Sequence, residues 1–289
     1  MAGVIPFGLA CFNLAKLTRF LRKKVVPFLL YLPPVISFLL VAIVTTALAA
    51  TGLHFVRRKY PAEVLKENHE VAAIIFNAFG LLYGVVVAFV VFVTWSGYDD
   101  ASKNLQLEAS DTIDLFHSAQ GLTEPARKVI QQGLIDYADA VQLNVNKMST
   151  EEISIHSSPA LRKLLDFFNR MDAQSASNRE LYAESLKRLN NLAEHRRLRI
   201  FAGNNTIPPT IWLVLLVGGV ITVAYTYLFG TKNINAQYLM ITALTITLSW
   251  ILLLIYILDH PFTGISKVST KPVTEVIEMM RSESESAQR

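Results

Sequence analysis

The chain has 289 residues, of which 52% are hydrophobic and only 17% are charged. Because charged residues make up about a quarter of a soluble domain, this balance indicates a membrane protein. A single cysteine, Cys11, excludes an internal disulfide framework, and no Cys or His spacing points to a zinc site, so we expect neither a metal nor another cofactor. The net charge of +4 concentrates at the ends of apolar segments, which favours contact with lipid headgroups over binding to nucleic acid.

The first segment, residues 1–24, interleaves apolar and basic side chains at helical spacing. This pattern predicts an amphipathic interfacial helix ahead of the first membrane crossing. A secretory signal would place its charges before a short apolar core, whereas here the apolar residues come first. The first crossing is predicted over residues 25–56, where Pro33 and Pro34 either open the helix or kink it, since proline lacks a backbone donor.

The second crossing is predicted over residues 71–98, which contain no Asp, Glu, Lys or Arg. A helix of this length measures about 40 Å and crosses a hydrocarbon layer of about 30 Å. One of its faces combines small residues with an asparagine, which suits either close helix packing or a pore lining. The candidate pore-lining residues are Asn77, Gly80, Leu81, Gly84, Ala88 and Phe92. An apolar constriction that gates by dewetting is a further possibility, for which plain packing or contact with lipid is the alternative; its candidates are Val85, Val86, Val87, Phe89 and Phe92.

The same helix continues into an acidic stretch without a helix breaker. Asp100, Glu108, Asp111 and Asp114 lie at spacings that place them on one face. The simplest interpretation is a solvated helix face. If several copies of the helix surround an axis, the same residues instead form an acidic vestibule, and both interpretations stay open at this point.

Residues 99–207 are predicted to form a cytosolic helical domain. Apolar residues recur at helical spacing after Pro125, after Pro159 and again over residues 181–200, with mixed charges between them. The last of these helices ends in a basic cluster at the expected membrane edge, where phosphate headgroups are the default partners. The cluster comprises Arg196, Arg197 and Arg199.

The third and fourth crossings are predicted over residues 209–230 and 236–258, followed by a cytosolic tail over residues 259–289. Asp259 and His260 follow the last crossing directly. We expect Asp259 to tie this helix end to a nearby arginine or a backbone donor, with proton transfer as the less favoured role. The serines and glutamates from about Ser282 predict a disordered end.

The predicted fold is an all-α membrane protein with four transmembrane helices and a helical cytosolic domain inserted between the second and third. Four crossings put both termini and residues 99–207 on one side of the membrane. Lys and Arg near the membrane ends are more numerous on that side than on the other, so the positive-inside rule makes it cytoplasmic. We expect a multi-pass protein of the cell (inner) membrane.

Four stretches resemble the bestrophin-like domain family of bacterial and plant membrane proteins. They are GLLYGVVVAFVVFVTWSGYDDA with the following LEAS, the EPAR and DYADAV pair, RRLRIFAGNNTIPPTIWLVLLVGG, and LDHPFTGISKVS after the last crossing, together spanning roughly residues 70 to 275. The chain departs from the family where members often carry a Glu-Trp pair, because it has Asn144, Val145, Asn146 and Lys147 there.

The resemblance implies a channel, since bestrophins are oligomeric chloride channels whose second transmembrane helix lines the pore and whose cytosolic part is helical. The dense acidic run of the animal calcium clasp is missing, so calcium gating is not implied. The leading hypothesis is a homo-oligomeric ion channel, a tetramer or pentamer in the lipid bilayer that passes inorganic ions. For the ion selectivity, the acidic face slightly favours cations, whereas the resemblance suggests anions.

A membrane-anchored sensor or scaffold whose cytosolic helices bind a protein partner is the alternative function. It requires only an amphipathic bundle on a four-helix anchor. An enzyme is not expected, because no Ser/His/Asp set, HExxH motif or paired carboxylates occur within a membrane run.

Overall fold

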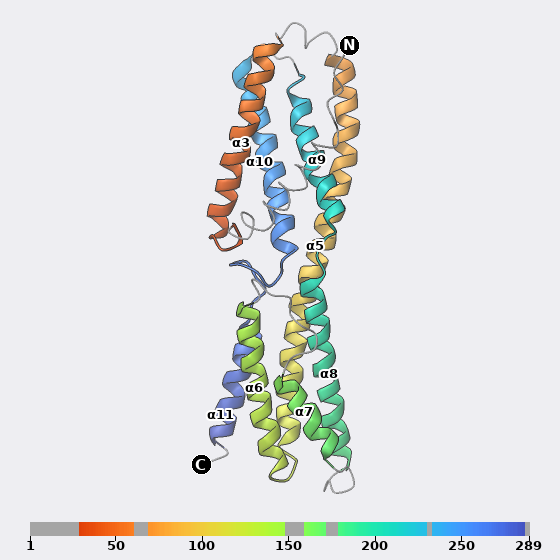
Figure 1. The fold of residues 1–289 in the computed structure, drawn as a ribbon, viewed down its shortest axis with the longest axis vertical. Coiled ribbons are helices and arrows are strands. Elements are labelled where there is room, and N and C mark those ends of the chain that lie inside the picture. The colour runs from red at the N-terminus through yellow and green to blue at the C-terminus, as the bar shows by residue number, and fades with distance from the viewer. Residues whose placement is uncertain (1–28, 61–68, 148–158, 172–178, 230–232, 287–289) are drawn as a thin grey trace, which may run out of the picture. The chain divides into compact units, whose positions relative to one another are not determined.

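The computed structural model describes residues 29–60, 69–147, 159–171, 179–229 and 233–286, and these are helical with short connections and no strand. The helix predicted over residues 1–24 lies outside this part of the chain. Figure 1 shows the helices in chain order: α3 (Pro34–Lys59), α5 (His69–Ala119), α6 (Ala126–Lys147), α7 (Pro159–Arg170), α8 (Arg179–Asn204), α9 (Pro209–Thr226), α10 (Ile234–Leu258) and α11 (Lys271–Ser286).

Four segments of the described chain are long and apolar enough to cross a membrane: Pro34–Lys59, Ala72–Ala119, Arg179–Thr226 and Ile234–Leu258. They correspond to the four predicted crossings, and the all-α class is confirmed. The first helix begins at Pro34 with Pro33 as its N-cap, so the two prolines open this helix and do not kink it. The chain is non-helical over residues 205–208, which separates α8 from α9.

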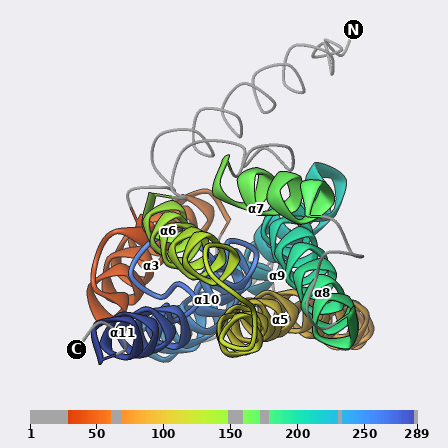
Figure 2. The same ribbon diagram turned by 90° about the horizontal axis from the view of Figure 1, so that it is seen from below.

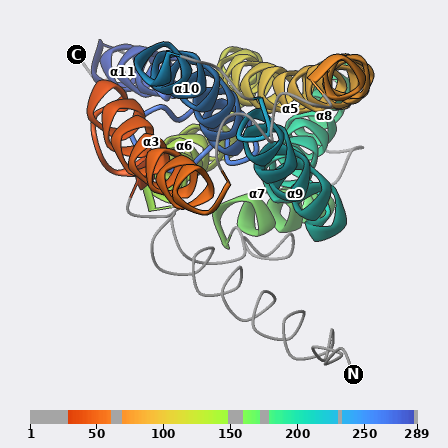
Figure 3. The same ribbon diagram turned by 90° about the horizontal axis from the view of Figure 1, so that it is seen from above.

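The chain divides into two compact units, and α5 contributes to both. The first unit contains α3, α5 up to Val91, α9 and α10; α9 lies beside α5, and α10 beside α3 (Figures 1 and 3). Hydrogen bonds connect these helices: Tyr83 Oη donates to the carbonyl of Leu215 at 2.7 Å, and Tyr227 Oη donates to the carbonyl of Ala49 at 2.9 Å. In a membrane such bonds and close contacts replace the hydrophobic drive between helices.

A tight connection follows α10 and closes against the segment before α3. Gly264 adopts a φ of +81°, and a Cβ there would lie 2.2 Å from the carbonyl oxygen of Leu30. Only glycine fits this combination of positive φ and close backbone approach. The same carbonyl accepts a hydrogen bond from the backbone N–H of Ile265 at 2.9 Å.

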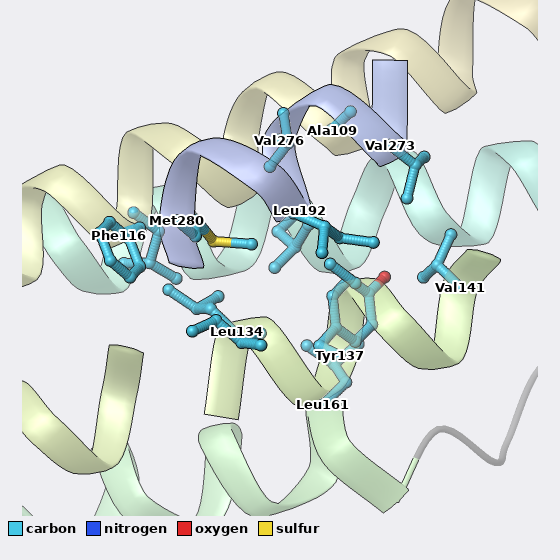
Figure 4. Packing of buried hydrophobic residues seen from close by; sticks show 14 of the residues in the cluster. Ala109, Phe116, Leu134, Tyr137, Val141, Leu161, Leu192, Val273, Val276 and Met280 are labelled. Atoms are coloured by element: carbon cyan, nitrogen blue, oxygen red, sulfur yellow. The ribbon is translucent and has the colours of Figure 1, made fainter. Parts of the chain in front are cut away.

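The second unit contains α5 from Phe92 onward together with α6, α7, α8 and α11. Figure 2 shows α5 between α8 and α11. Its helices bury one continuous apolar core, and Figure 4 shows a part of it to which α5, α6, α7, α8 and α11 all contribute side chains. Fully buried members include Leu105, Phe116, Leu134, Tyr137, Phe168, Leu192 and Met280.

The tail differs from the predicted disorder. Helix α11 extends to Ser286, four residues beyond Ser282, where the sequence suggested that order ends. Its apolar side chains Val273, Val276, Ile277 and Met280 are buried in the core of the second unit. Burial of these apolar side chains stabilises the helix, although the composition of its polar face is typical of a disordered segment.

We predict that Gly218→Ala destabilises the first unit. A Cβ at this position of α9 would lie 2.4 Å from the ring of Tyr83, so the substitution forces the ring away from its bond to Leu215. Overpacking of this kind costs about 1–3 kcal/mol. The check is thermal unfolding in detergent, with Gly97→Ala as the matched control because a Cβ there meets nothing within 4 Å. Equal melting temperatures for the two variants would contradict the prediction.

Candidate functional site

The uncharged part of α5 has one packed face and one open face. Tyr83, Val87 and Val90 are buried against the rest of the first unit. The predicted pore-lining stripe lies elsewhere on the helix: Leu81 and Phe92 are 70% and 67% exposed. The remaining members are also open, with Asn77, Gly84 and Ala88 exposed and Gly80 half-buried.

The two glycines of this stripe have no close neighbour on another helix in the described part of the chain. A Cβ at Gly80 or Gly84 would meet nothing within 4 Å among the described residues. The close approach that glycine permits is used instead on α9, where Gly218 receives the ring of Tyr83. Of the candidate constriction residues, Val85, Val86 and Phe89 are exposed, whereas Val87 belongs to the packed face.

The polar continuation of α5 carries a buried ion pair. Glu108 and Arg199 are 1% and 2% exposed. Both Nε and Nη2 of Arg199 donate to the Glu108 carboxylate, and Tyr137 Oη donates to its Oε1 at 2.5 Å. A guanidinium that presents two donors to one carboxylate is the geometry that offsets the loss of water around both charges.

The environment of this cluster shifts two pKa values. Burial, followed by the negative charge of Glu108, raises the pKa of Tyr137 well above its ordinary value. Burial lowers the pKa of Arg199, but the adjacent Glu108 more than offsets this, so the pKa lies above its ordinary value. Tyr137 therefore remains a neutral donor and Arg199 a cation. Nη1 of Arg199 is buried and has no hydrogen-bond partner in the described part of the chain.

Two further acids of the same helix pair with α8. Asp111 Oδ2 lies 2.5 Å from His195 Nδ1, and Arg188 Nη1 donates to Asp114 Oδ2 at 2.8 Å. Along α8 the residue numbers of the partners thus decrease as the residue numbers on α5 increase, which is the pattern of two antiparallel helices.

These contacts correct the expected acidic vestibule. Glu108 is inside the second unit, and Asp111 and Asp114 each have a basic partner within the same chain. Asp100 alone of the four candidates is an exposed acid for which no ion pair is found among the described residues. The physical reason is that the amphipathic bundle buries part of this face, and a buried carboxylate requires a cationic partner.

The structure also places the residues of the predicted membrane edge. Asp259 is buried, and its Oδ1 accepts a hydrogen bond from the backbone N–H of Ile207 at 2.7 Å. This joins the end of α10 to the residue that precedes Pro208, the N-cap of α9. His260 is half-buried. Arg196 is buried like Arg199, so neither fits the expected headgroup contact, whereas Arg197 is exposed.

The sequence reasoning missed the basic partners of the α5 acids and the role of Tyr137. A signal was present, because Glu108, Asp111 and Asp114 are matched in reverse order by Arg199, His195 and Arg188. This complementary spacing predicts an antiparallel helix pair. Among the residues that the structure describes, no group of three or more His, Cys, Asp or Glu side chains is placed to hold a metal ion.

These features define a class: an all-α membrane protein with a largely apolar helical unit, a second unit built around a buried ion pair, and one helix common to both. The Bestrophin-like domain family matches residues 43–273, and the chain belongs to this family.

Solved structures share the fold. A bacterial bestrophin homolog from Klebsiella pneumoniae is 14% identical, with a TM-score of 0.64 over 82% of this chain and 96% of its own. A singly substituted variant of that homolog gives the same identity and TM-score over 84% of this chain and 97% of its own. No curated protein matches the chain.

We predict that Glu108→Gln strongly destabilises the second unit. The substitution leaves Arg199 buried without a counter-charge, which costs about 3–5 kcal/mol. The double variant Glu108→Gln/Arg199→Met removes both charges and should recover part of this loss. Denaturant unfolding in detergent measures both effects. A double variant less stable than Glu108→Gln alone would contradict the prediction.

The shifted tyrosine predicts a pH dependence. Since the pKa of Tyr137 is raised in the folded protein, its contribution to stability is complete below pH 10.0, the ordinary pKa, and is lost as the pH rises from there through the folded pKa. The free energy of unfolding should therefore fall more steeply above pH 10.0 in the wild type than in Tyr137→Phe. Because all other tyrosines are common to both proteins, the difference in slope reports Tyr137. Parallel pH profiles would refute the assignment.

Proposed function

We propose that the protein is a homo-oligomeric ion channel in which the uncharged part of α5 lines the axis. The observation that carries this proposal is the division of α5 into a packed and an open face. Tyr83, Val87 and Val90 contact the same chain, while the stripe from Asn77 to Phe92 remains open and contains no charge. Several copies arranged around an axis would bring these stripes together as a pore wall. Membership of the Bestrophin-like family supports this function.

The acidic residues beyond the membrane do not carry the selectivity. Glu108, Asp111 and Asp114 are matched by basic partners on α8, so the slight preference for cations expected from this face loses its basis. Among the four candidate acids of α5, Asp100 is the exposed one without a basic partner in the described part of the chain. In this proposal, the lining between Asn77 and Phe92 sets the ion preference, and the reversal potential under a salt gradient gives its sign.

The proposed orientation follows from basic residues near the membrane ends. Their majority on the side of the second unit places that unit and both termini in the cytoplasm, with the first unit in the cell (inner) membrane. The exposed apolar side chains of the first unit, such as Leu39, Ile43, Leu82 and Val220, suit direct contact with lipid.

Cysteine accessibility tests the lining. In a Cys11→Ser background, we predict that a water-soluble, thiol-reactive cation added to channels in planar bilayers reduces the current of Ala88→Cys. The adjacent substitution Val87→Cys is the matched control, because Val87 is buried inside the chain and should not react. A current that responds at position 87 and not at 88 would refute the assignment of the open face to the axis.

Stoichiometry separates the channel from the alternative function. A stable oligomer with conductance supports the channel. A monomer in detergent, together with bilayers that stay silent across voltage and pH, would favour a membrane-anchored sensor or scaffold whose helical unit binds a protein partner.

A further inference from the structure

The second unit has an open groove between α5 and α11. Gln106, Ala109 and Ser110 form one wall, and residues of α11 from Pro272 to Ser282 form the other. Met279, a large apolar side chain that lines the groove, is 52% exposed, and Leu107, which follows Gln106 on α5, is 46% exposed.

The α11 side of this groove is acidic. Glu275 and Glu278 are exposed, and neither makes an ion pair within the part of the chain that the structure describes. By contrast, Glu283 on the same helix contacts His117 of α5 and Gln120, which directly follows that helix. The groove therefore combines apolar surface with unneutralised negative charge.

A complementary surface lies on the opposite flank of α5. On the side away from the core, helix α8 has an exposed face that includes Arg197, Leu198 and Phe201. Leu198 and Phe201 are 40% and 62% exposed, and Arg197 has no acidic partner among the described residues. This face combines apolar surface with positive charge.

The two surfaces lie at the same height along α5. Arg199 contacts Glu108 and His195 contacts Asp111, so Arg197, midway between them, is level with residues 109 and 110. On the other flank, Glu283 of α11 contacts His117 of α5. Glu275 lies eight residues before Glu283, and Ala109 lies eight residues before His117. Since helices rise by the same amount per residue, Glu275 is also level with Ala109.

Equal height is the condition for contact in a closed ring. Rotation about an axis parallel to α5 generates the next copy without changing the position of any residue along that axis. In a heterologous interface, one surface of each copy meets a different surface of the next, and the ring closes when these surfaces match. Charge complementarity between the acidic groove and the basic face of α8 fixes which surfaces meet.

We propose that the α5/α11 groove binds the exposed face of α8 from a second copy of this chain, with Arg197 opposite Glu275 and Leu198 against Leu107. This inference deepens the proposed function, since it rests on a ring in which α5 runs along the axis, and it assigns the interface that holds the ring together.

Charge reversal tests the pair. Glu275→Arg places two cations opposite each other in every interface, and Arg197→Glu places two acids there. Each single variant should lose the oligomer peak in light scattering of the detergent-solubilised full chain at low salt. The double variant Glu275→Arg/Arg197→Glu restores opposite charges and should recover the wild-type mass. The matched control is Asp166→Arg, which makes the same charge change at an exposed position of α7 and should leave the oligomer intact.

Disulfide trapping provides a second measurement. In the Cys11→Ser background, Glu275→Cys/Arg197→Cys should form a covalent ladder of oligomers on non-reducing gels. A bond within one copy is not expected, because α5 lies between α8 and α11 (Figure 2) and packed helix axes are about 8–10 Å apart.

The outcomes separate the interface from the channel itself. If the wild type is an oligomer but the single variants keep it intact, or the double variant fails to recover it and no ladder forms, this interface is wrong and the proposed channel stands. If the wild type is a monomer, both are wrong. Trapping of a different protein at Glu275→Cys, with no ladder, would assign the groove to that partner and overturn the proposal.

Discussion

The ion pair between Glu108 and Arg199 is the constraint on which the second unit depends. Both charges are withdrawn from water, so each is tolerable only because the other is present and Tyr137 donates to the same carboxylate. The pair fixes the register of α8 against α5 and thereby aligns Asp111 with His195. An apolar contact would permit small slips along the helix, whereas a charged contact of this geometry does not.

The register matters because α5 belongs to both units. The same helix carries the open uncharged stripe in the first unit and the charged contacts in the second. Side chains along α5 repeat with the helical period. Because the face that carries Tyr83 and Val87 is buried, only residues on the other faces of the helix remain open. Within the first unit, the face of α5 that carries Tyr83 is packed, which leaves its other face for lipid, for the pore or for neighbouring copies.

Glycine serves two different purposes in this chain. Gly218 and Gly264 are each in close contact with another element, the ring of Tyr83 in one case and the backbone of Leu30 in the other. A Cβ at Gly80 or Gly84 would meet nothing within 4 Å among the residues that the structure describes. In a protein whose helices associate through close packing, unoccupied glycines on an open face suggest a contact that a single copy does not satisfy.

The sequence by itself determined the number of helices that are long and apolar enough to cross a membrane, because long uncharged runs such as residues 71–98 have one stable solution in lipid. It also determined the family, through stretches such as LDHPFTG. Only the tertiary structure decided the fate of the acids on α5, since Glu108 and Asp100 look alike in the sequence and differ in what packs over them. The order of α11 was likewise decided by burial of Met280, a long-range contact that local composition does not encode.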